Sequence, residues 1–408
     1  MRTMQVQPIL AALRKHRIAT VLIALEIALA CAVLCNACFL IVQRVQAMHV
    51  VSGVDEAALG TIKLDGFTPE QAADLNARVL SALRGVAGVQ AATVVSAVPF
   101  SEHAGRAGVF LDGDKAQFGG VVEFYLASPG TAEAFGLHLV AGRFPTQDEY
   151  APVGNFVPKN PPVLITRALA EHFWPGENPL GKTFLSGETF RVIGVLDHLA
   201  VPEPGGGEAK DPDWSVYVPA QPGPQFAGRY LVRADPADLP GVMRRAREAV
   251  LKAAPEAVLD QAQSQTIPDL RNTYFLGSRV MAGLLTGVVV ALLGTTALGI
   301  VGLASFWVAQ RRKQIGVRRA LGATRSDILR YFQIENFLIV SIGIALGMAL
   351  AFGINVGLMK VYELPRLPVW YLPVGAIALW ILGQLAVLAP ALRAAAVPPV
   401  AAMRSAGG

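Results

Sequence analysis

Charged residues are scarce in this chain. Only 16% of its 408 residues are Asp, Glu, Lys or Arg, whereas 53% are hydrophobic. Soluble chains usually have about a quarter charged residues. The composition therefore excludes an ordinary soluble protein and favours one that is partly embedded in a membrane.

Cysteine is scarcer still, and the three cysteines lie together as Cys31, Cys35 and Cys38. The polar region 44–278 has none, so it contains no disulfide and must fold on an ordinary hydrophobic core. The cysteine spacing matches an iron–sulfur motif of radical enzymes. It also places the three side chains on one face of an apolar helix, where cysteine packs as a small residue, and this second interpretation is favoured.

Catalytic motifs are missing too, and the one pattern typical of nucleotide binding lies in an unsuitable context. Residues 176–183, GENPLGKT, have the G-x-x-x-x-G-K-[ST] spacing, but they follow the helix expected at 167–173, whereas a phosphate-binding loop follows a strand and opens a helix. The glycines of Gly205–Gly207 lack the Lys-Ser/Thr of such a loop. H-E-x-x-H and G-x-S-x-G are also absent. Surface or structural roles are favoured over metal binding for the scattered histidines His49, His103, His138, His172 and His198. We therefore expect no catalytic, cofactor or metal site in this chain.

The chain has instead four apolar runs, each long enough for a membrane span of about 20 residues. They cover residues 18–43, 280–309, 332–359 and 369–390. The first run is longer than the apolar part of a signal peptide, about 7–15 residues, and no small-x-small cleavage site follows it. We expect a retained first span, preceded by an interfacial helix within residues 1–17.

Positive charge gathers on one side of these runs. Residues 44–278 contain 19 Lys or Arg and 26 Asp or Glu, whereas the rest of the chain contains 16 and 4. Cations favour the cytoplasmic ends of spans, so both termini, including the tail 394–408, and the segment 310–331 are expected in the cytoplasm. Residues 44–278 are expected on the outer side. The basic isoelectric point thus reflects membrane topology and does not indicate nucleic acid binding.

The outer region contains two similar strand–helix–strand patterns, in residues 61–95 and 229–263. We expect them to pair into one α/β subdomain. The residues between them, about 100–225, are rich in glycine and proline and carry short β-type runs such as Pro162–Thr166. A helix is expected at Arg167–Phe173. The pattern predicts a β-rich subdomain inserted into the first, and a mixed α+β domain as a whole.

Two acidic residues lie inside the apolar runs, where a charge is costly and indicates function by default. Glu335 lies near the start of the third run, and an ion pair with Arg325 or Arg330 is the favoured interpretation. Glu26 lies deeper, in the first run. For Glu26, an interhelical hydrogen bond in an oligomer is favoured over a proton-relay or substrate-binding role.

Glycines punctuate the second and third runs. Gly343-x3-Gly347 is a small-x3-small pattern, which lets two helix backbones approach closely. It indicates close helix packing or dimerisation.

The segment 310–331 is the most informative part of the chain. Its cations are Arg311, Arg312, Lys313, Arg318, Arg319, Arg325 and Arg330. The pattern predicts two short helices around Gly322, which permits the turn between them, and Thr324-x2-Asp327 looks like a capping box for the second helix. A structured cationic element between two spans is suited to receiving force from a soluble cytoplasmic partner.

Residues 310–328, QRRKQIGVRRALGATRSDI, resemble the signature of FtsX/MacB-type ABC transporter permeases, approximately R-x-R-E-I-G-[IV]-R-[RK]-A-L-G-A. Residues 390–403, PALRAAAVPPVAAM, are similar to the closing pattern of that family. Residues 128–144 and 163–195 are similar to parts of the MacB periplasmic core domain. The resemblance covers nearly the whole chain.

The resemblance implies a four-span subunit of the bacterial inner membrane with a periplasmic domain of two subdomains, one porter-like and one inserted. It implies a permease, in efflux or export, that passes the motion of separate cytoplasmic ATPase subunits to its outer domain, which is called mechanotransmission. ATP and Mg would be bound by those partners, because the ATPase region fused to MacB proper is not in this sequence. A second copy or a homologous permease would complete a dimer, and a periplasmic adaptor is a further candidate partner.

Carried over by motif, the residues that couple to the ATPase would be Arg318, Arg319, Gly322, Ala323 and Thr324, with Asp327 as the cap. The sequence departs from the family at Gln314, where the family has Glu, and Ala396-Val397 replaces an Asp before Pro398. Pairing with an identical or a sister permease therefore stays open. A lipoprotein-release permease, a division or envelope regulator, and a membrane-anchored sensor or scaffold without an ATPase are the alternative functions.

Overall fold

The structure is a computed structural model that describes residues 17–102, 105–111, 117–205, 211–362 and 367–396. The chain divides into two compact units. Gln46–Gly277 form the outer domain, and Met1–Val45 with Ser278–Gly408 form the helical unit. The predicted interfacial helix within residues 1–17 and most of the predicted tail 394–408 lie outside the described residues.

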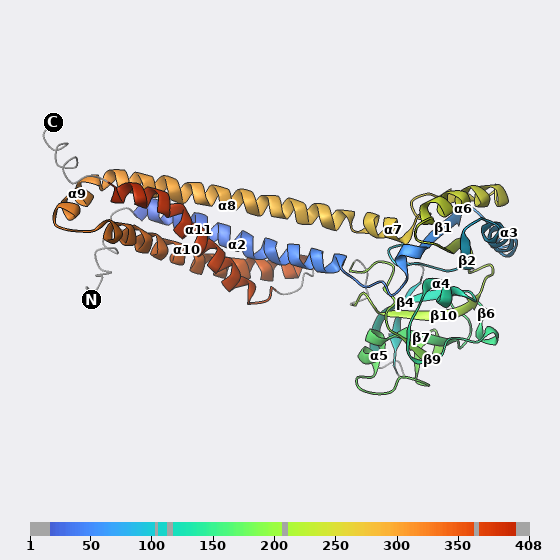
Figure 1. The fold of residues 1–408 in the computed structure, drawn as a ribbon. Coiled ribbons are helices and arrows are strands. Elements are labelled where there is room, and N and C mark those ends of the chain that lie inside the picture. The colour runs from blue at the N-terminus through green and yellow to red at the C-terminus, as the bar shows by residue number, and fades with distance from the viewer. Residues whose placement is uncertain (1–16, 103–104, 112–116, 206–210, 363–366, 397–408) are drawn as a thin grey trace. The chain divides into compact units, whose positions relative to one another are not determined.

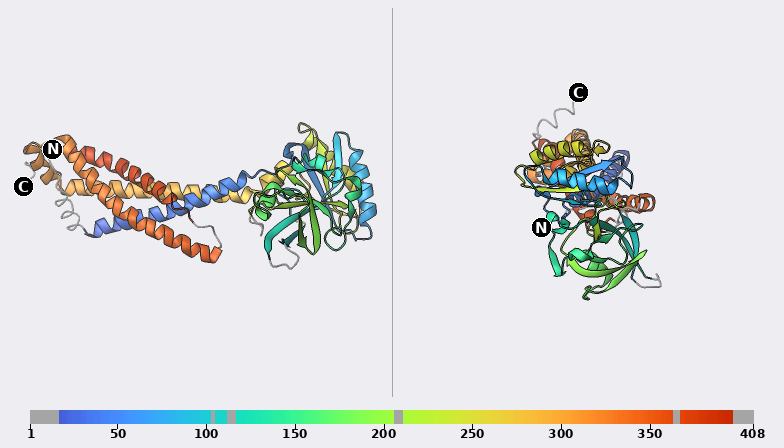
Figure 2. Two further views of the ribbon diagram at one scale, coloured as in Figure 1. Left: turned by 90° about the horizontal axis from the view of Figure 1, so that it is seen from below. Right: turned by 90° about the vertical axis from the view of Figure 1, so that its right-hand side faces the viewer.

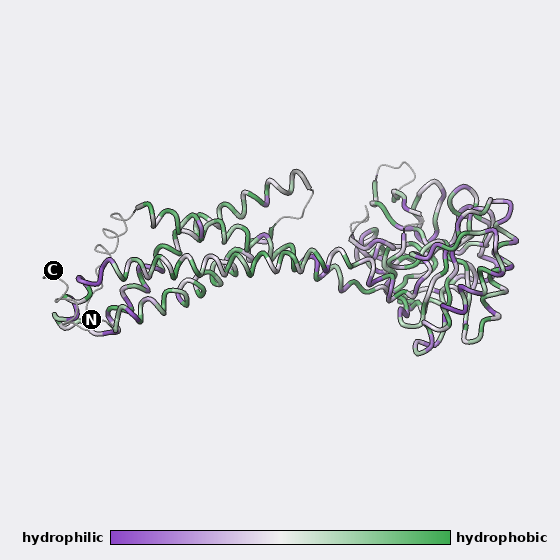
Figure 3. Tube along the Cα trace, turned by 90° about the horizontal axis from the view of Figure 1, so that it is seen from above, coloured by the Kyte–Doolittle hydropathy of each residue, from purple (hydrophilic) through white to green (hydrophobic). Residues whose placement is uncertain are grey.

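Within the described residues, four helices are long and apolar enough to cross a membrane, as predicted. Figure 3 shows hydrophobic residues along them: α2 (Arg17–Met48), α8 (Leu276–Gln310), α10 (Arg325–Tyr362) and α11 (Tyr371–Ala395). The short helix α9 (Arg312–Ala320) lies between α8 and α10. The second short helix expected after Gly322 is not separate. It forms the first turns of α10, because nothing in the sequence after Arg325 interrupts the helix before the apolar run begins.

Small residues hold the helical unit together, in which α10 and α11 lie side by side (Figures 1 and 2). A Cβ atom added at Gly343 would lie 2.8 Å from the Cβ atom of Ile27 on α2, and one added at Gly347 would lie 2.7 Å from the carbonyl oxygen of Ala28. The Gly343-x3-Gly347 pattern therefore packs α10 against α2 of the same chain.

The cysteine face of α2 is part of this packing. Cys31 and Cys35 are buried, and a Cβ atom added at Gly375 of α11 would lie 2.6 Å from Cys35 Sγ. Across the described residues, no group of three His, Cys, Asp or Glu side chains could hold a metal ion. The burial of Cys31 and Cys35 and the close approach of Gly375 agree with the packing interpretation of the cysteines.

The first subdomain of the outer domain is an antiparallel sheet in the order β12–β1–β11–β2. Its strands are β1 (Leu59–Asp65), β2 (Val89–Val94), β11 (Arg229–Ala234) and β12 (Val258–Asp260). Helices α3 (Ala72–Arg84) and α6 (Leu239–Ala253) pack against it with their apolar faces (Figure 1). These are the elements of the two strand–helix–strand patterns, so their predicted pairing is confirmed. The patterns interlock, because β11 of the second lies between β1 and β2 of the first.

The inserted subdomain lies between β2 and β11 in the chain and is β-rich, as predicted. Its strand order is β4–β3–β8–β9–β7–β10–β6, and β5 pairs with β9. Since β10 also pairs with β4, six of these strands close into a ring. The strands are β3 (Arg106–Phe110), β4 (Phe118–Ala127), β5 (Leu139–Gly142), β6 (Ala151–Pro152), β7 (Pro162–Thr166), β8 (Thr183–Ser186), β9 (Glu188–Leu196) and β10 (Ser215–Gln221).

Two short helices belong to the inserted subdomain, α4 (Thr131–Phe135) and α5 (Arg167–Phe173). The second occupies the residues predicted for it. The core of the subdomain is aromatic: the rings of Phe184 and Phe190 stack with centroids 5.1 Å apart, and Phe124 lies 5.0 Å from Phe190.

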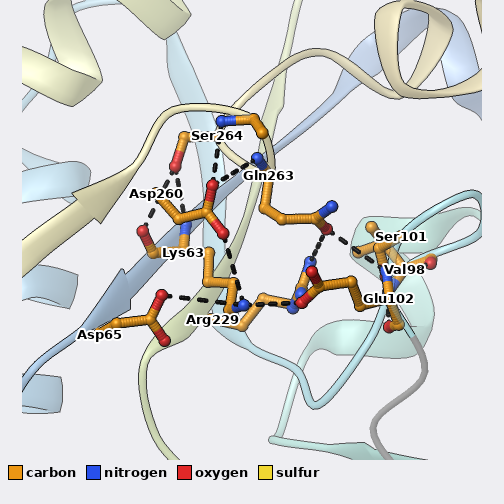
Figure 4. A network of polar contacts seen from close by, with 10 residues as sticks. Lys63, Asp65, Val98, Ser101, Glu102, Arg229, Asp260, Gln263 and Ser264 are labelled. Atoms are coloured by element: carbon orange, nitrogen blue, oxygen red, sulfur yellow. Dashed lines mark hydrogen bonds and ion pairs between the residues drawn. The ribbon is translucent and has the colours of Figure 1, made fainter. Parts of the chain in front are cut away.

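Polar contacts hold the joint between the two subdomains (Figure 4). The ammonium of Lys63 on β1 lies 2.8 Å from the carboxylate of Glu102 and 3.4 Å from that of Asp260. The side-chain oxygen of Gln263 accepts hydrogen bonds from the Glu102 backbone N–H and from Arg229 Nη1. Arg229 is buried, and this burial lowers the pKa of its guanidinium. The chain enters the inserted subdomain near Glu102 and leaves it near Arg229, so both crossings are tied to the same sheet.

Candidate functional site

The segment 310–331, here called the basic turn, is a folded platform. Figure 3 shows hydrophilic residues gathered at this end of the helical unit. Ile315 of α9 is buried in a small apolar cluster with Ile328, Phe332, Ala391, Ala394 and Ala395. The basic turn therefore packs on the start of α10 and the end of α11, and it is not a loose tether.

Gly322 ends α9 in the way its sequence position predicts. Its φ is +96°, in the left-handed region that favours glycine. The Ala323 N–H donates to the carbonyl of Arg318 at 3.0 Å, and the Gly322 N–H donates to that of Arg319 at 3.2 Å. This is a Schellman closure, which satisfies the last carbonyls of α9 and reverses the chain toward α10.

Thr324 and Asp327 form the capping box that the sequence predicts for α10. The Asp327 N–H donates to Thr324 Oγ1 at 3.2 Å, and the Thr324 N–H donates to Asp327 Oδ2 at 2.9 Å. The two bonds satisfy donors that a helix start would otherwise leave unpaired. The reversal between α9 and α10 is thus specified by residues only a few positions apart.

Glu335 is buried and paired, but the predicted partners were wrong. Its carboxylate accepts two hydrogen bonds from Arg311 Nη1, at 2.9 and 2.8 Å, and its side chain is 1% exposed. Arg325 and Arg330 are exposed. Neither lies three or four positions from Glu335, so neither shares the face of α10 on which Glu335 lies. Arg311 also lies over the ring of Trp307. The pair joins the end of α8 to α10.

Two of the predicted coupling cations make contacts within the chain. Arg319 Nη1 donates to the carbonyl of Ala395, the last residue of α11, where a cation is favourable at the helix C-terminus. The guanidinium of Arg318 lies 4.8 Å from the centre of the Tyr331 ring. Both residues therefore stabilise the folded conformation of the basic turn.

The outer face of the basic turn combines cations with apolar side chains. Leu321 is 83% exposed and Val317 is 52% exposed. The exposed cations of the basic turn are Arg312, Lys313, Arg318, Arg325 and Arg330. Sequence reasoning missed the two apolar residues. Their four-residue spacing was the available signal, since it places both on one face of α9 while Ile315 lies on another.

Gln314 is exposed on α9 and lines a cavity of about 20 Å³ together with Arg311 and Arg318. A glutamate at this position would lie near two guanidinium groups. The amide of Gln314 is neutral, and the carboxylate that Arg311 binds is that of Glu335.

Glu26 lies at the contact between α2 and α8. A Cβ atom added at Gly299 would lie 2.8 Å from Glu26 Oε2, so the glycine lets this carboxylate lie close to α8. The structure thus places Glu26 beside another helix of its own chain, and its predicted roles in an oligomer or a proton relay stay predictions.

Comparisons with known proteins match both units. Residues 20–268 match the family described as MacB-like periplasmic core domain, and residues 286–399 match the one described as FtsX-like permease C-terminal. The periplasmic region of MacB from Actinobacillus actinomycetemcomitans is a similar solved structure, with 16% identity, a TM-score of 0.34 and coverage of 56% of this chain and 97% of that one.

Full-length proteins also match this chain over part of their length. The macrolide export ATP-binding/permease protein MacB of Bdellovibrio bacteriovorus is 29% identical over 209 residues, which are 48% of this chain and 31% of that protein. The uncharacterized ABC transporter permease YvrN of Bacillus subtilis is 28% identical over 260 residues, 59% of this chain and 61% of that protein. The matched region spans about a third of the length of the MacB relatives. The chain belongs to the MacB- and FtsX-type ABC transporter permeases.

Proposed function

We propose that this chain is the permease subunit of an ABC transporter whose ATP and Mg are bound by separate cytoplasmic ATPase subunits. In this proposal the chain has no ATPase activity and passes the movement of its partners to the outer domain. Efflux or export is the proposed direction, which the name of the macrolide export relatives supports.

The observation that carries the proposal is the outer face of the basic turn. An 83% exposed leucine on a folded turn is costly in water, and exposed cations precede and follow it in the chain. Such a surface suits an apolar groove with an acidic rim on a soluble partner, since a helix binds a groove through anchors spaced by three or four residues. A lipid interface would also cover Leu321, so co-purification of an ATP-binding subunit decides between the two.

The helix that follows the outer domain suits the transmission of movement. α8 is one helix of 35 residues without an internal proline, about 50 Å long at 1.5 Å per residue. Arg311 and Glu335 join its end to α10. A displacement of the basic turn would therefore be passed along α8 as movement of a stiff rod.

The proposed location is the bacterial inner membrane, with the basic turn and both termini in the cytoplasm and the outer domain in the periplasm. The distribution of cations supports this orientation. A second permease, identical or homologous, and a periplasmic adaptor are proposed partners.

The experiment replaces the apolar anchor by a charge. Leu321→Asp should reduce co-purification of an ATP-binding subunit from native membranes by about tenfold or more, because burying a leucine contributes ~1.5–3 kcal/mol and an acid would meet the acidic rim. The matched control is Leu251→Asp, at a 47% exposed leucine of the outer domain. Co-purifying chains are identified by mass spectrometry, and membrane insertion of each variant is measured in parallel.

Two results would contradict the proposal. If the unaltered chain brings down no ATP-binding subunit in mild detergent with added nucleotide, a sensor or scaffold becomes the better function. If Leu321→Asp and Leu251→Asp co-purify the subunit equally, the basic turn is not the contact surface. The size of the outer domain, Gln46–Gly277, favours a transporter over a division regulator.

A further inference from the structure

One guanidinium joins the two segments that link the outer domain to the first two apolar helices. The first connector, residues 49–58, follows α2, and the second connector is helix α7 (Ile267–Tyr274), which precedes α8. Arg271 of α7 donates through Nη2 to the carbonyls of Met48 and Val50, at 2.9 and 2.7 Å. Its Nη1 donates to the carboxylate of Glu56 at 2.6 Å. Both connectors are thus bound by the same side chain.

The contacts of Arg271 are of a strong kind. Met48 is the last residue of α2, so its carbonyl has no partner within the helix, and a cation is favourable there. The guanidinium carbon lies 4.8 Å from the centre of the Phe100 ring and 5.8 Å from that of Phe275. The side chains of Arg271 and Glu56 are only 24% and 22% exposed, which limits screening by water. A planar fork with several donors fits this arrangement better than a single ammonium.

The first connector is in turn bound to the inserted subdomain. The Ala200 N–H donates to the carbonyl of Ser52 at 2.9 Å, and the Asp55 N–H donates to the carbonyl of Phe135 at 2.9 Å. Ala200 follows β9, and Phe135 ends α4. Backbone bonds of this kind tie the first connector to two separate places of the inserted subdomain.

Close packing and an ion pair reinforce this attachment. Gly53 has a φ of +77°, and a Cβ atom there would collide with the carbonyl of His198 and lie 2.8 Å from the nitrogen of Leu199. The carboxylate of Asp55 lies 2.6 Å from Arg233 on β11 of the first subdomain, and Nη1 of Arg233 in turn donates to the carbonyl of Ala134 in α4 at 2.9 Å. The first connector therefore packs closely against the inserted subdomain, and a side chain at position 53 would not fit.

The second connector is attached elsewhere by its backbone. The Thr61 N–H of β1 donates to the carbonyl of Gln265, two residues before α7 begins, and Gly60 and Thr266 form a β-bridge. Through these bonds α7 is fixed to the first subdomain. Tyr274 of α7 also donates to the carbonyl of Pro204 in the inserted subdomain, at 3.1 Å. Arg271 adds a second link, from α7 to the first connector and through it to the inserted subdomain.

We propose that Arg271 is a positioning residue that makes the two connectors move as one, so that displacement of α8 reaches the inserted subdomain as well as the first. This rests on the proposed function, in which α8 is displaced by an ATPase. The link itself is a property of the outer domain, and it is testable without an ATPase.

The first measurement uses the full chain alone, in lipid nanodiscs, with hydrogen exchange read by mass spectrometry. Arg271→Ala should speed exchange of the amides in residues 49–58 by about tenfold, since three charge-assisted hydrogen bonds are lost. Arg245→Ala is the matched control, because Arg245 also binds a carboxylate and a backbone carbonyl, those of Asp238 and Ala87, but touches neither connector. Equal exchange of residues 49–58 in the two variants would overturn the link.

The second measurement adds the co-purified ATPase. In the unaltered chain, ATP should change the exchange of residues 195–201 of the inserted subdomain. With Arg271→Ala this change should fall to a third or less, while ATP hydrolysis and co-purification persist. A nucleotide-dependent change of unaltered size in Arg271→Ala would overturn the positioning role.

The two measurements separate failure of this inference from failure of the proposed function. Absence of an ATPase with the unaltered chain contradicts the proposed function and the transmission role together, whereas the first measurement still decides the link. Arg271→Lys sharpens the test. The ammonium keeps the charge but not the fork, so only partial rescue of the slow exchange is expected, and complete rescue would show that charge alone holds the connectors.

Discussion

The outer domain and the helical unit are held together by opposite kinds of residue. The largest fully buried side chains, among them Tyr125, Tyr217, Phe184 and Phe190, belong to the outer domain. In the helical unit, α10 meets α2 through glycine, alanine and cysteine, as at Gly347. In water, removing large apolar surface drives folding. In lipid that gain is missing, so helices associate where small residues let their backbones approach.

The two units also use charge differently. Ion pairs of the outer domain, such as that of Arg143 with Glu149, include exposed partners, whereas Arg311 and Glu335 form a pair with side chains 12% and 1% exposed. A charge inside an apolar bundle needs a partner, since it has little water around it. We therefore expect large-to-small substitutions to destabilise the outer domain most, and small-to-large substitutions to destabilise the helical unit most.

The largest effect is expected from overfilling the helical unit. Gly347→Leu should nearly abolish folded protein, because the added side chain would collide with the backbone of Ala28. The yield of monodisperse protein on size-exclusion chromatography measures this. The control is Gly353→Leu, on the same helix, where a Cβ atom meets nothing within 4 Å. Equal yields would show that α2 and α10 do not pack through this glycine.

A cavity in the outer domain should have the next largest effect. Phe190→Ala removes a fully buried ring that stacks on Phe184, and should lower the free energy of unfolding by about 3–5 kcal/mol. Urea denaturation, followed through the exchange of β9 amides, measures the change. Phe118→Ala, at a 59% exposed ring, should change the free energy of unfolding by no more than about 0.5 kcal/mol. Similar losses in both variants would contradict the aromatic core.

The smallest effect is expected from a surface pair. Hydrogen bonds from Arg143 lower the pKa of Glu149 from 4.5 to about 2. A lowered pKa means that the stabilisation is present above the unfolded value near 4.5 and is lost as the pH falls through about 2. Glu149→Gln should thus destabilise the outer domain at pH 6, and its difference from the unaltered chain should shrink between pH 4.5 and pH 2. The effect is small because the Arg143 side chain is 49% exposed.

Denaturation at several pH values measures this prediction. Arg143→Gln serves as the partner variant and should show the same pH dependence. A difference between Glu149→Gln and the unaltered chain that stays constant down to pH 2 would contradict the ion pair.

Much of the fold follows from local patterns. The helix at Arg167–Phe173 and the strand at Pro162–Thr166 occupy the predicted residues, because each follows from a short run of side chains with one periodicity. The turn at Gly322 and the cap at Thr324 follow equally from neighbouring residues. The order of the strands did not follow, since β11 pairs with β1 and β2 across the whole inserted subdomain.

For the candidate site, the sequence predicted the backbone turn and its caps, but it did not predict side-chain exposure or ion-pair partners. The sequence identified the basic turn and the capping residues, yet it missed Leu321 and gave Glu335 the wrong arginine. Exposure and ion pairing depend on which face of α9 meets α10 and α11. A sequence without its packing does not say which face is covered.

By itself, the sequence determined the four apolar helices, the position of the basic turn and the reversal at Gly322, because each depends on residues close together in the chain. Only the tertiary structure decided that Glu335 binds Arg311 and that Arg271 binds Met48, Val50 and Glu56. These partners are far apart in sequence and meet only after helices and strands have packed. Hydrogen bonds require atoms within about 3 Å, and only packing supplies that proximity.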